Sequence, residues 1–346
     1  MNSELVACIA EDRQNFEPAL RILVASLARH SPGMRLELFC PNASAAFSQW
    51  LTKYPQANLT KASPGGIEWR KYDIKPHALL ELLKGGFDNV LWIDSDILLA
   101  RDCRMLFAGL SRETIVVSEE ALSGGRSDDD GIRARLWGME VGRILPLAAN
   151  TSVVRATGAH IPLLERWAEL LASPTYRNAQ DRLWAEREIH TMGDQEVLTA
   201  VLAGSQFSDV PVKFLKRGPD IIQFFGINGY TVSERLRHLV QGMPPFVHSQ
   251  GFRPWLSSTT ENGFPARIRM LNNELSPYTA LARSYSGVLE DTTWLHPKST
   301  AAAVLTIFGG WHAPLVGLPI ALVADAARTL KCLRSSRMNE VKIAAS

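Results

Sequence analysis

The stretch Asn89-Val90-Leu91-Trp92-Ile93-Asp94-Ser95-Asp96-Ile97-Leu98 carries the strongest structural signal in this chain of 346 residues. Its apolar run has the length of a buried strand, and two acidic residues follow with one residue between them. Side chains alternate along an extended chain, so Asp94 and Asp96 are expected to point to one side. Two carboxylates beside a buried strand are costly without a counter-charge, and the pattern therefore predicts a bound metal or another cation.

Spacing alone does not make this prediction, because Asp128 and Asp130 have the same spacing. That second pair lies in a hydrophilic stretch and is interpreted as solvated charge. A structural alternative remains for Asp94 and Asp96 as well, namely a turn at the end of a strand in which an aspartate caps the next element. The preceding apolar strand is what favours a functional interpretation of the first pair.

The residues around the acidic pair predict an α/β fold. Strands are expected at 5–10, 35–40 and 89–93, and helices at 16–29, 45–54 and 74–83. This alternation indicates a parallel or mostly parallel sheet with helices on both faces, which binds ligands beyond the carboxyl ends of its strands. Further along, we expect a long loop at 118–142, a strand at 147–154, and helices at 161–172 and 195–203.

Composition excludes several classes of protein. With 46% apolar and 21% charged residues, the chain can bury a core and is neither disordered nor collagen-like. A formal net charge of +2 gives no general attraction for nucleic acid, so none is expected as a partner. Four cysteines (Cys8, Cys40, Cys103 and Cys332) lack the spacing of a zinc site or a disulfide framework. The N-terminal residues do not resemble a secretory signal, and a cytoplasmic location is expected.

The chemistry of a strand-end acid pair can be narrowed by its surroundings. Phosphatases of the haloacid dehalogenase type place such a pair near the N-terminus and follow it with a Gly-Thr turn, whereas Ile97 and Leu98 follow here. The glycine-rich phosphate loops of nucleotidyltransferases, P-loop proteins and dinucleotide-binding proteins do not occur. Of the reactions that use an acid pair at the end of a strand, metal-dependent glycosyl transfer from a nucleoside diphosphate sugar remains the one that these residues fit. A non-catalytic nucleotide-sugar-binding protein and a metal-dependent phosphohydrolase stay open as alternatives.

Several separated motifs resemble glycosyltransferase family 8 and its relatives with the GT-A fold. They lie within the first 260 residues, and the last of them is the most specific because it fixes five residue types in order. The motifs are Ile74-Lys75-Pro76, Asp94-Ser95-Asp96, Asn150-Thr151-Ser152-Val153, Gly193-Asp194-Gln195-Glu196 and His248-Ser-Gln-Gly251-Phe-Arg253-Pro254-Trp255. The chain departs from the family pattern at Arg253, where lysine is usual, and at Ser152, where glycine is common.

The resemblance implies a Rossmann-like GT-A fold with a mixed central sheet flanked by helices. Beyond the residues that it covers, the pattern of the sequence itself predicts a helical C-terminal appendage. It implies a catalytic domain at 1–260, with a donor-binding part at about 1–100 and an acceptor and metal part at about 101–260. A linker or extension is expected at 261–297.

The resemblance also implies roles for individual residues. A divalent ion, Mn²⁺ or Mg²⁺, would bind to Asp94, Asp96 and His248. A UDP-sugar donor would contact Ala7, Cys8, Ala10, Lys75, Asp94, Ser95, Gly251, Arg253 and Trp255. The catalytic residues would be Asn150, Asp194 and Gln195, and the reaction would retain the anomeric configuration by displacement on one face of the sugar. The acceptor hydroxyl would belong to a saccharide, a glycolipid or a protein.

The C-terminal residues 298–346 are apolar at first and basic afterwards. No charged side chain occurs between Ala301 and Ala324, but glycine and proline interrupt the run, so we expect two short apolar segments with a bend. The basic residues Arg328, Lys331, Arg334 and Arg337 follow. This pattern predicts peripheral contact of 301–337 with an anionic membrane, at the inner face, and helices at a homodimer interface are the alternative.

Overall fold

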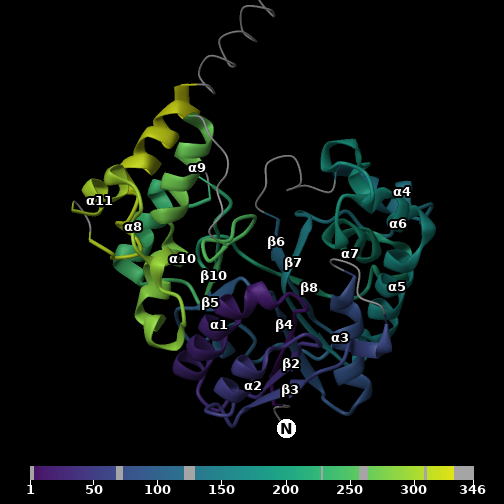
Figure 1. The fold of residues 1–346 in the computed structure, drawn as a ribbon. Helices are drawn as coiled ribbons and strands as arrows, with labels where there is room; N and C mark the ends of the chain where they lie inside the picture. The colour runs from purple at the N-terminus through teal and green to yellow at the C-terminus, as the bar shows by residue number, and fades with distance from the viewer. Residues whose placement is uncertain are drawn as a thin grey trace, which may run out of the picture.

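A seven-stranded sheet lies at the centre of the computed structural model (Figure 1), which describes residues 4–67, 73–120, 129–226, 229–256, 264–307 and 310–330. The strand order is β3-β2-β1-β4-β7-β6-β8. The strands of this sheet are β1 (Val6–Ala10), β2 (Leu36–Phe39), β3 (Ala57–Thr60), β4 (Asn89–Ile93), β6 (Ile115–Glu119), β7 (Ala149–Thr157) and β8 (Val212–Leu215).

Most strand pairs of this seven-stranded sheet are parallel, and within it the strand β7 is the exception. β1 pairs in parallel with β2 and β4, while β7 runs antiparallel to both β4 and β6. The predicted mixed α/β sheet is therefore confirmed. Because β7 runs against β4, its first residues lie beside the end of β4, and the backbone N–H of Asp94 donates to the carbonyl of Ser152 (2.9 Å). This pairing places the motif that begins at Asn150 next to the acidic pair.

A second, three-stranded sheet has the order β5-β10-β9 and begins where the first sheet ends. Its strands are β5 (Ile97–Leu99), β9 (Ile221–Gln223) and β10 (Phe246–His248). β5 directly follows the acidic pair, and β10 lies antiparallel to it with His248 opposite Ile97. The backbone N–H of Ser249 donates to the carbonyl of Asp96 (3.0 Å). The small sheet thus brings His248 to the acidic pair from a distant part of the sequence.

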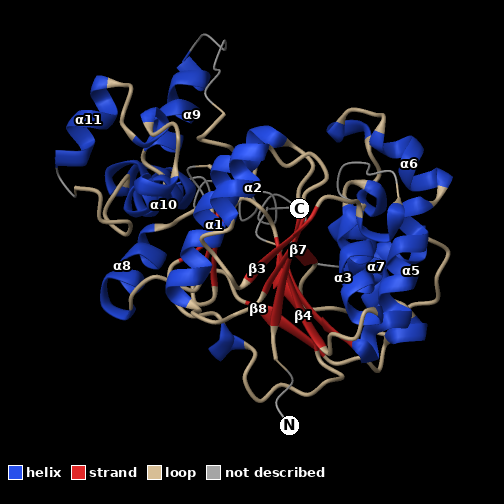
Figure 2. Cartoon of the chain, turned by 60° about the horizontal axis from the view of Figure 1, so that its bottom comes forward, coloured by secondary structure: helices blue, strands red, loops and turns tan. Residues whose placement is uncertain are grey.

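Helices cover both faces of the central sheet, with α1 and α2 on one side and α3, α5 and α7 on the other (Figure 2). The apolar side chains of the strands alternate between two cores, so that Ala7 belongs to one and Cys8 to the other. The helices on these faces are α1 (Glu17–His30), α2 (Ala45–Leu51), α3 (Ile74–Lys84), α4 (Ile132–Leu136), α5 (Ile161–Ala172), α6 (Pro174–Gln180) and α7 (Asp194–Ala203).

The prediction of a loop at 118–142 is only partly correct. Residues 121–128, including Asp128, lie outside the described residues. The remainder contains the short helix α4, in which Ala134 joins the core and Arg133 is fully buried. Arg133 donates from Nε to Glu196 Oε2 (2.5 Å), and this buried ion pair allows a stretch rich in charged residues to pack as a helix.

The described part of the C-terminal third is helical and contacts the first half of the chain. It contains α8 (Val232–Gln241), α9 (Phe264–Glu274), α10 (Pro277–Ala282), α11 (Thr300–Ile307) and a helix at 318–330. Within the segment expected as a linker, Tyr278 and Trp294 share an apolar cluster with Phe16 and Ile22, so this segment packs on the domain. Turns separate α11 from the helix at 318–330, and among the described residues no helix is both long and apolar enough to cross a bilayer.

Candidate active site

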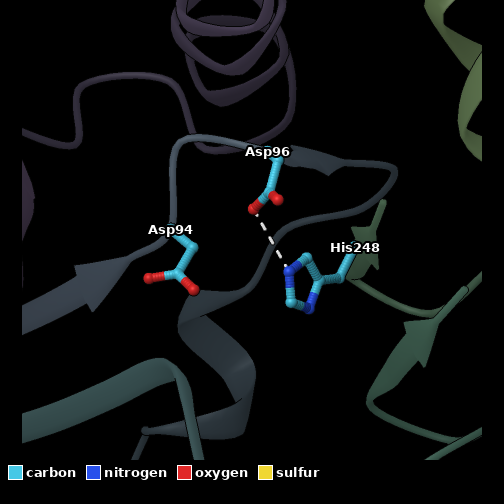
Figure 3. Close-up of side chains that lie close together, drawn as sticks. All are labelled: Asp94, Asp96 and His248. Atoms are coloured by element: carbon cyan, nitrogen blue, oxygen red, sulfur yellow. Dashed lines mark ion pairs between the residues drawn. The ribbon is translucent and has the colours of Figure 1, made fainter. Parts of the chain in front are cut away.

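Three side chains that could hold a metal ion meet between the two sheets (Figure 3). Asp94 and Asp96 lie in the turn between β4 and β5, and His248 ends β10. One ligand atom from each lies within 4.8 Å of the other two. His248 Nε2 is 3.1 Å from Asp96 Oδ1, and both carboxylates are partly exposed. The two acids and the imidazole that were predicted to act together are therefore side by side.

The donor set suits a divalent cation that accepts both oxygen and nitrogen ligands, such as Mn²⁺. Burial alone would raise the pKa of Asp96, but the attraction of His248 and Arg253 outweighs it and leaves that pKa below its ordinary value. The carboxylate is therefore charged at neutral pH. His248 Nδ1 is buried and has no hydrogen-bond partner among the described residues, which leaves Nε2 as the nitrogen that faces the acids.

Lys75 is buried in the first turn of α3 and lies between two acids. Its Nζ is 3.0 Å from Asp94 Oδ1 and 3.4 Å from Asp194 Oδ2, and it donates to Thr151 Oγ1 (2.9 Å). Burial would lower the pKa of Lys75, but the two carboxylates outweigh burial and raise it well above its ordinary value. The charged ammonium thus orients Asp94, which also accepts a hydrogen bond from Trp92 Nε1 (2.7 Å). Donor contact by Lys75 stays a prediction.

Asp194 begins α7 but does not cap it. Its Oδ2 accepts a hydrogen bond from Thr151 Oγ1 (2.6 Å) in addition to the ion pair with Lys75. Burial raises the pKa of Asp194, and Lys75 and Thr151 oppose that rise. Asp194 is buried and paired with Lys75, and it therefore connects the turn that holds Asp94 and Asp96 to α7.

The amides of Asn150 and Gln195 meet at a buried carboxylate, Glu120. Gln195 Nε2 donates to Glu120 Oε2 (2.6 Å), and Asn150 Nδ2 donates both to that oxygen (3.1 Å) and to Gln195 Oε1 (3.3 Å). These bonds fix the amide orientation of Gln195, the half-buried member of the three predicted catalytic residues. Asn150, Asp194 and Gln195 are therefore brought together at the start of β7 and α7.

The loop after β10 carries the remaining motif residues. Gly251 has a φ of 78°, a left-handed conformation that favours glycine. Arg253 is exposed, and its guanidinium lies over the ring of Phe16, 4.9 Å from the centroid. Arg13 lies over the same ring at 3.5 Å, so two cations gather beside the acidic pair. Trp255 is buried, with ring centroids 5.4 Å from Phe16 and 5.8 Å from Tyr278. Its position is that of a packing residue, and donor contact stays a prediction.

The first strand contributes less surface than expected. Ala7 and Cys8 are fully buried inside the sheet, so their side chains have no exposed surface for a donor, because each packs into one of the two cores. Ala10 ends the strand and is almost buried. Ser95, at the centre of the acidic motif, donates to Glu11 Oε2 (2.6 Å) and so connects this turn to the end of β1.

Several polar residues of the site were missed by the sequence analysis. Glu120 directly follows the strand β6, but Ser118 and Glu119 separate it from the apolar residues of that strand, so its signal in the sequence is weaker than that of Asp94 after β4. Thr151 lay within a quoted motif without a role. The buried pair of Arg133 and Glu196 gave no signal, because their distance in the sequence conceals their contact.

Comparison with known proteins finds distant similarity to solved structures. No protein-family model matches the chain, and no curated protein matches it. The galactosyltransferase LgtC, solved with donor and acceptor sugar analogs, aligns over 82% of this chain and 99% of its own, with 16% identity and a TM-score of 0.49. The apo structure of the bifunctional glycosyltransferase WbbM aligns over 79% of this chain and 50% of its own, with 13% identity and a TM-score of 0.49. The chain thus spans about half the length of WbbM.

The glycosyltransferase GlyE of Streptococcus pneumoniae TIGR4 aligns over 84% of this chain and 66% of its own, with 13% identity and a TM-score of 0.43. Similarity at this level is weak. The function proposed for this chain therefore depends on its own side chains.

Proposed function

We propose that this protein is a metal-dependent glycosyltransferase of the GT-A type. It would move a sugar from a UDP-sugar to an acceptor hydroxyl on a saccharide, a glycolipid or a protein. The sugar that we expect is a hexose. The observation that carries the proposal is the convergence of Asp94, Asp96 and His248 at the junction of the two sheets. A site of this kind at the strand ends suits a nucleotide diphosphate, and family 8 is the subgroup whose motifs it resembles.

The metal-binding residues would be Asp94, Asp96 and His248, and the ion would be Mn²⁺ or Mg²⁺. When bound, such an ion withdraws negative charge from a diphosphate leaving group. Arg253 supports the same purpose from the protein side, because its exposed guanidinium lies near Asp96 and can donate charge-assisted hydrogen bonds to phosphate oxygens.

The sugar subsite would lie beside Gln195. Asp194 is paired with Lys75 and Thr151, and Glu120 is almost fully buried beneath two amides, so neither carboxylate is free to attack a sugar. Gln195 instead presents a neutral amide oxygen that can stabilise positive charge at the anomeric carbon. We infer a displacement on one face of the sugar, with retained configuration and the departing phosphate accepting the proton of the acceptor.

Titration calorimetry of UDP, with and without Mn²⁺, tests the metal assignment. We expect Mn²⁺ to strengthen UDP binding to the wild type and to have little effect on Asp96→Asn, which removes one ligand charge. Asp130→Asn is the matched control, because Asp130 is exposed and asparagine also adopts its positive φ of 54°. Equal affinity with and without Mn²⁺ in the wild type would contradict a metal-dependent donor site.

Turnover tests the role of Gln195. Hydrolysis of UDP-sugars in Mn²⁺ should fall about a hundredfold in Gln195→Ala, the usual scale for losing one stabilising polar group, while UDP affinity stays the same. Unchanged turnover would remove Gln195 from the reaction. Hydrolysis of simple phosphate esters without any need for UDP would instead favour the phosphohydrolase alternative, and binding without turnover would favour the non-catalytic one.

A further inference from the structure

Helix α8 has its polar side inside and its apolar side outside. Glu234, Arg235 and His238 are buried, whereas Leu236, Leu239 and Val240 are 55%, 41% and 86% exposed. Surface helices of water-soluble domains show the opposite arrangement. Exposed apolar residues three and four positions apart form a contiguous stripe, which suggests contact with an apolar medium.

The inner side of α8 is fixed by its partners. Glu234 pairs with Arg217 (2.8 Å), and His238 contacts Tyr230 Oη through Nδ1 and the carbonyl of Gly218 through Nε2, both at 2.8 Å. Arg235 donates to the carbonyls of Pro314 and Val316. Rotation of the helix would leave these buried groups unpaired, which is costly, so the apolar stripe must face outward.

The helix at 318–330 also has an apolar outer side. Ala321 and Ala324 face inward, while Leu322, Val323 and Leu330 are 52%, 71% and 59% exposed. Asp325 connects this helix to α8, because its Oδ2 accepts a hydrogen bond from the backbone N–H of Val232 (3.0 Å). Both helices belong to the helical group that includes α9, α10 and α11 in Figure 1.

Basic residues lie on both helices and follow the second helix in the sequence. Arg237 is exposed on α8, and Arg328 is partly exposed on the second helix, where it pairs with Asp325. In the sequence that follows, Lys331, Arg334, Arg337 and Lys342 occur with Glu340 as the single acid. Basic charge around an apolar face complements a bilayer of anionic lipids. It disfavours a second copy of this chain, because a two-fold interface would set the same cations against one another.

We propose that the outer sides of α8 and of the helix at 318–330 form one membrane-binding surface for anionic lipid headgroups. The helices lie on the bilayer without crossing it. The surface extends the predicted contact of 301–337 to α8, a helix that is distant in sequence and was not part of that prediction. The inference needs neither the metal nor the donor, so it stands or falls independently of the proposed function.

Flotation of the full chain with vesicles tests the proposal. Wild type should float with vesicles of phosphatidylcholine and phosphatidylglycerol and much less with phosphatidylcholine alone. Leu236→Ser with Val240→Ser should lower the partition coefficient about tenfold, because two apolar side chains no longer enter the lipid. Leu183→Ser with Met105→Ser is the matched control, since both residues are well exposed but lie outside α8 and the helix at 318–330, and it should float like wild type.

Thermal unfolding and UDP affinity should be the same in both double variants, which shows that flotation reports the surface and not the fold. The proposal is overturned if wild type does not float with anionic vesicles, or if Leu236→Ser with Val240→Ser floats equally well. It is also overturned if light scattering shows a wild-type dimer that this variant dissociates, because the face then belongs to a second copy.

Discussion

At the scale of single residues, the buried ion pair of Arg133 and Glu196 shows how charge is stabilised next to the side-chain amide of Gln195. Glu196 also accepts a hydrogen bond from Gln195 Nε2 (3.4 Å), so this pair supports the proposed sugar subsite. Burial raises the pKa of Glu196, and Arg133 opposes that rise without cancelling it. Because the folded chain binds this proton more readily than the unfolded chain, its contribution to stability falls as the pH rises above the ordinary glutamate range.

We predict that Arg133→Met lowers the free energy of unfolding by about 3–5 kcal/mol at pH 8, since it leaves a buried carboxylate unpaired. The loss should shrink at pH 5, where Glu196 of the variant takes up a proton. Urea unfolding at both values measures it. Adding Glu196→Gln to Arg133→Met should abolish the pH dependence of the loss. A loss of equal size at both pH values would show that Arg133 acts through packing alone.

Some residues of the site could be predicted from the sequence pattern, and others could not. Asp94 and Asp96 were predictable because hydropathy places them directly after a buried strand. His248 was found only through a resemblance, since nothing in its neighbourhood distinguishes a ligand from a structural histidine. Lys75 shows the limit of a motif: its position in the site was predicted, but its ion pairs with Asp94 and Asp194 depend on contacts between distant segments.

At the scale of elements, the loop that follows β10 connects His248, a proposed metal ligand, to Arg253 through Gly251. A residue with a Cβ would be strained by the left-handed φ of Gly251 alone, because no atom lies within 4 Å of where the Cβ would be. We predict that Gly251→Ala costs about 1–2 kcal/mol of backbone free energy and moves Arg253. UDP should bind more weakly to this variant while Mn²⁺ binding, measured without nucleotide, stays the same.

Gly287→Ala is the control for that experiment, because Gly287 also has open space around it but does not have a positive φ. It should bind UDP like wild type. If Gly251→Ala binds UDP as tightly as wild type, then the loop conformation does not position a donor-binding residue.

Elements with local signals were predicted well. The helix expected at 161–172 matches α5, because Pro162 favours the first turn, the apolar side repeats every three or four residues, and Ser173 ends it. The helix α4 was taken for part of a loop, since its stability comes from the buried contact of Arg133 and not from an apolar stripe. Helix α8 shows the reverse case, in which a strong amphipathic pattern does not reveal which side faces the protein.

At the scale of the whole molecule, a mixed and mostly parallel sheet was predicted, but neither the identity of β7 as the antiparallel strand nor the second sheet was. Both depend on which strands pair, a choice made by contacts between segments far apart in the chain. These two features place the residues after Asn150 and the side chain of His248 beside Asp94 and Asp96. The arrangement also divides the apolar interior into two cores, which lie on opposite faces of the same strands.

Three buried cysteines can be used as probes of unfolding in these two cores. Cys8 lies in the core under α3, α5 and α7, while Cys40 and Cys103 lie in the core under α1 and α2. Burial raises the pKa of all three thiols, that of Cys103 to about 12, so the reactive thiolate is scarce at pH 8. We predict that none of the three reacts with a disulfide reagent in the native protein, and that all three react in guanidinium chloride.

The rate of labelling then tests whether the cores unfold together. Because both cores are built on β1 and β4, opening one removes the support of the other, and the domain should behave as a single cooperative unit. In moderate denaturant with excess reagent, peptide mass spectrometry should find Cys8, Cys40 and Cys103 modified at one common rate. Earlier labelling of Cys8 alone would show that the core under α3, α5 and α7 opens independently, and the shared strands would then not couple the two faces of the sheet.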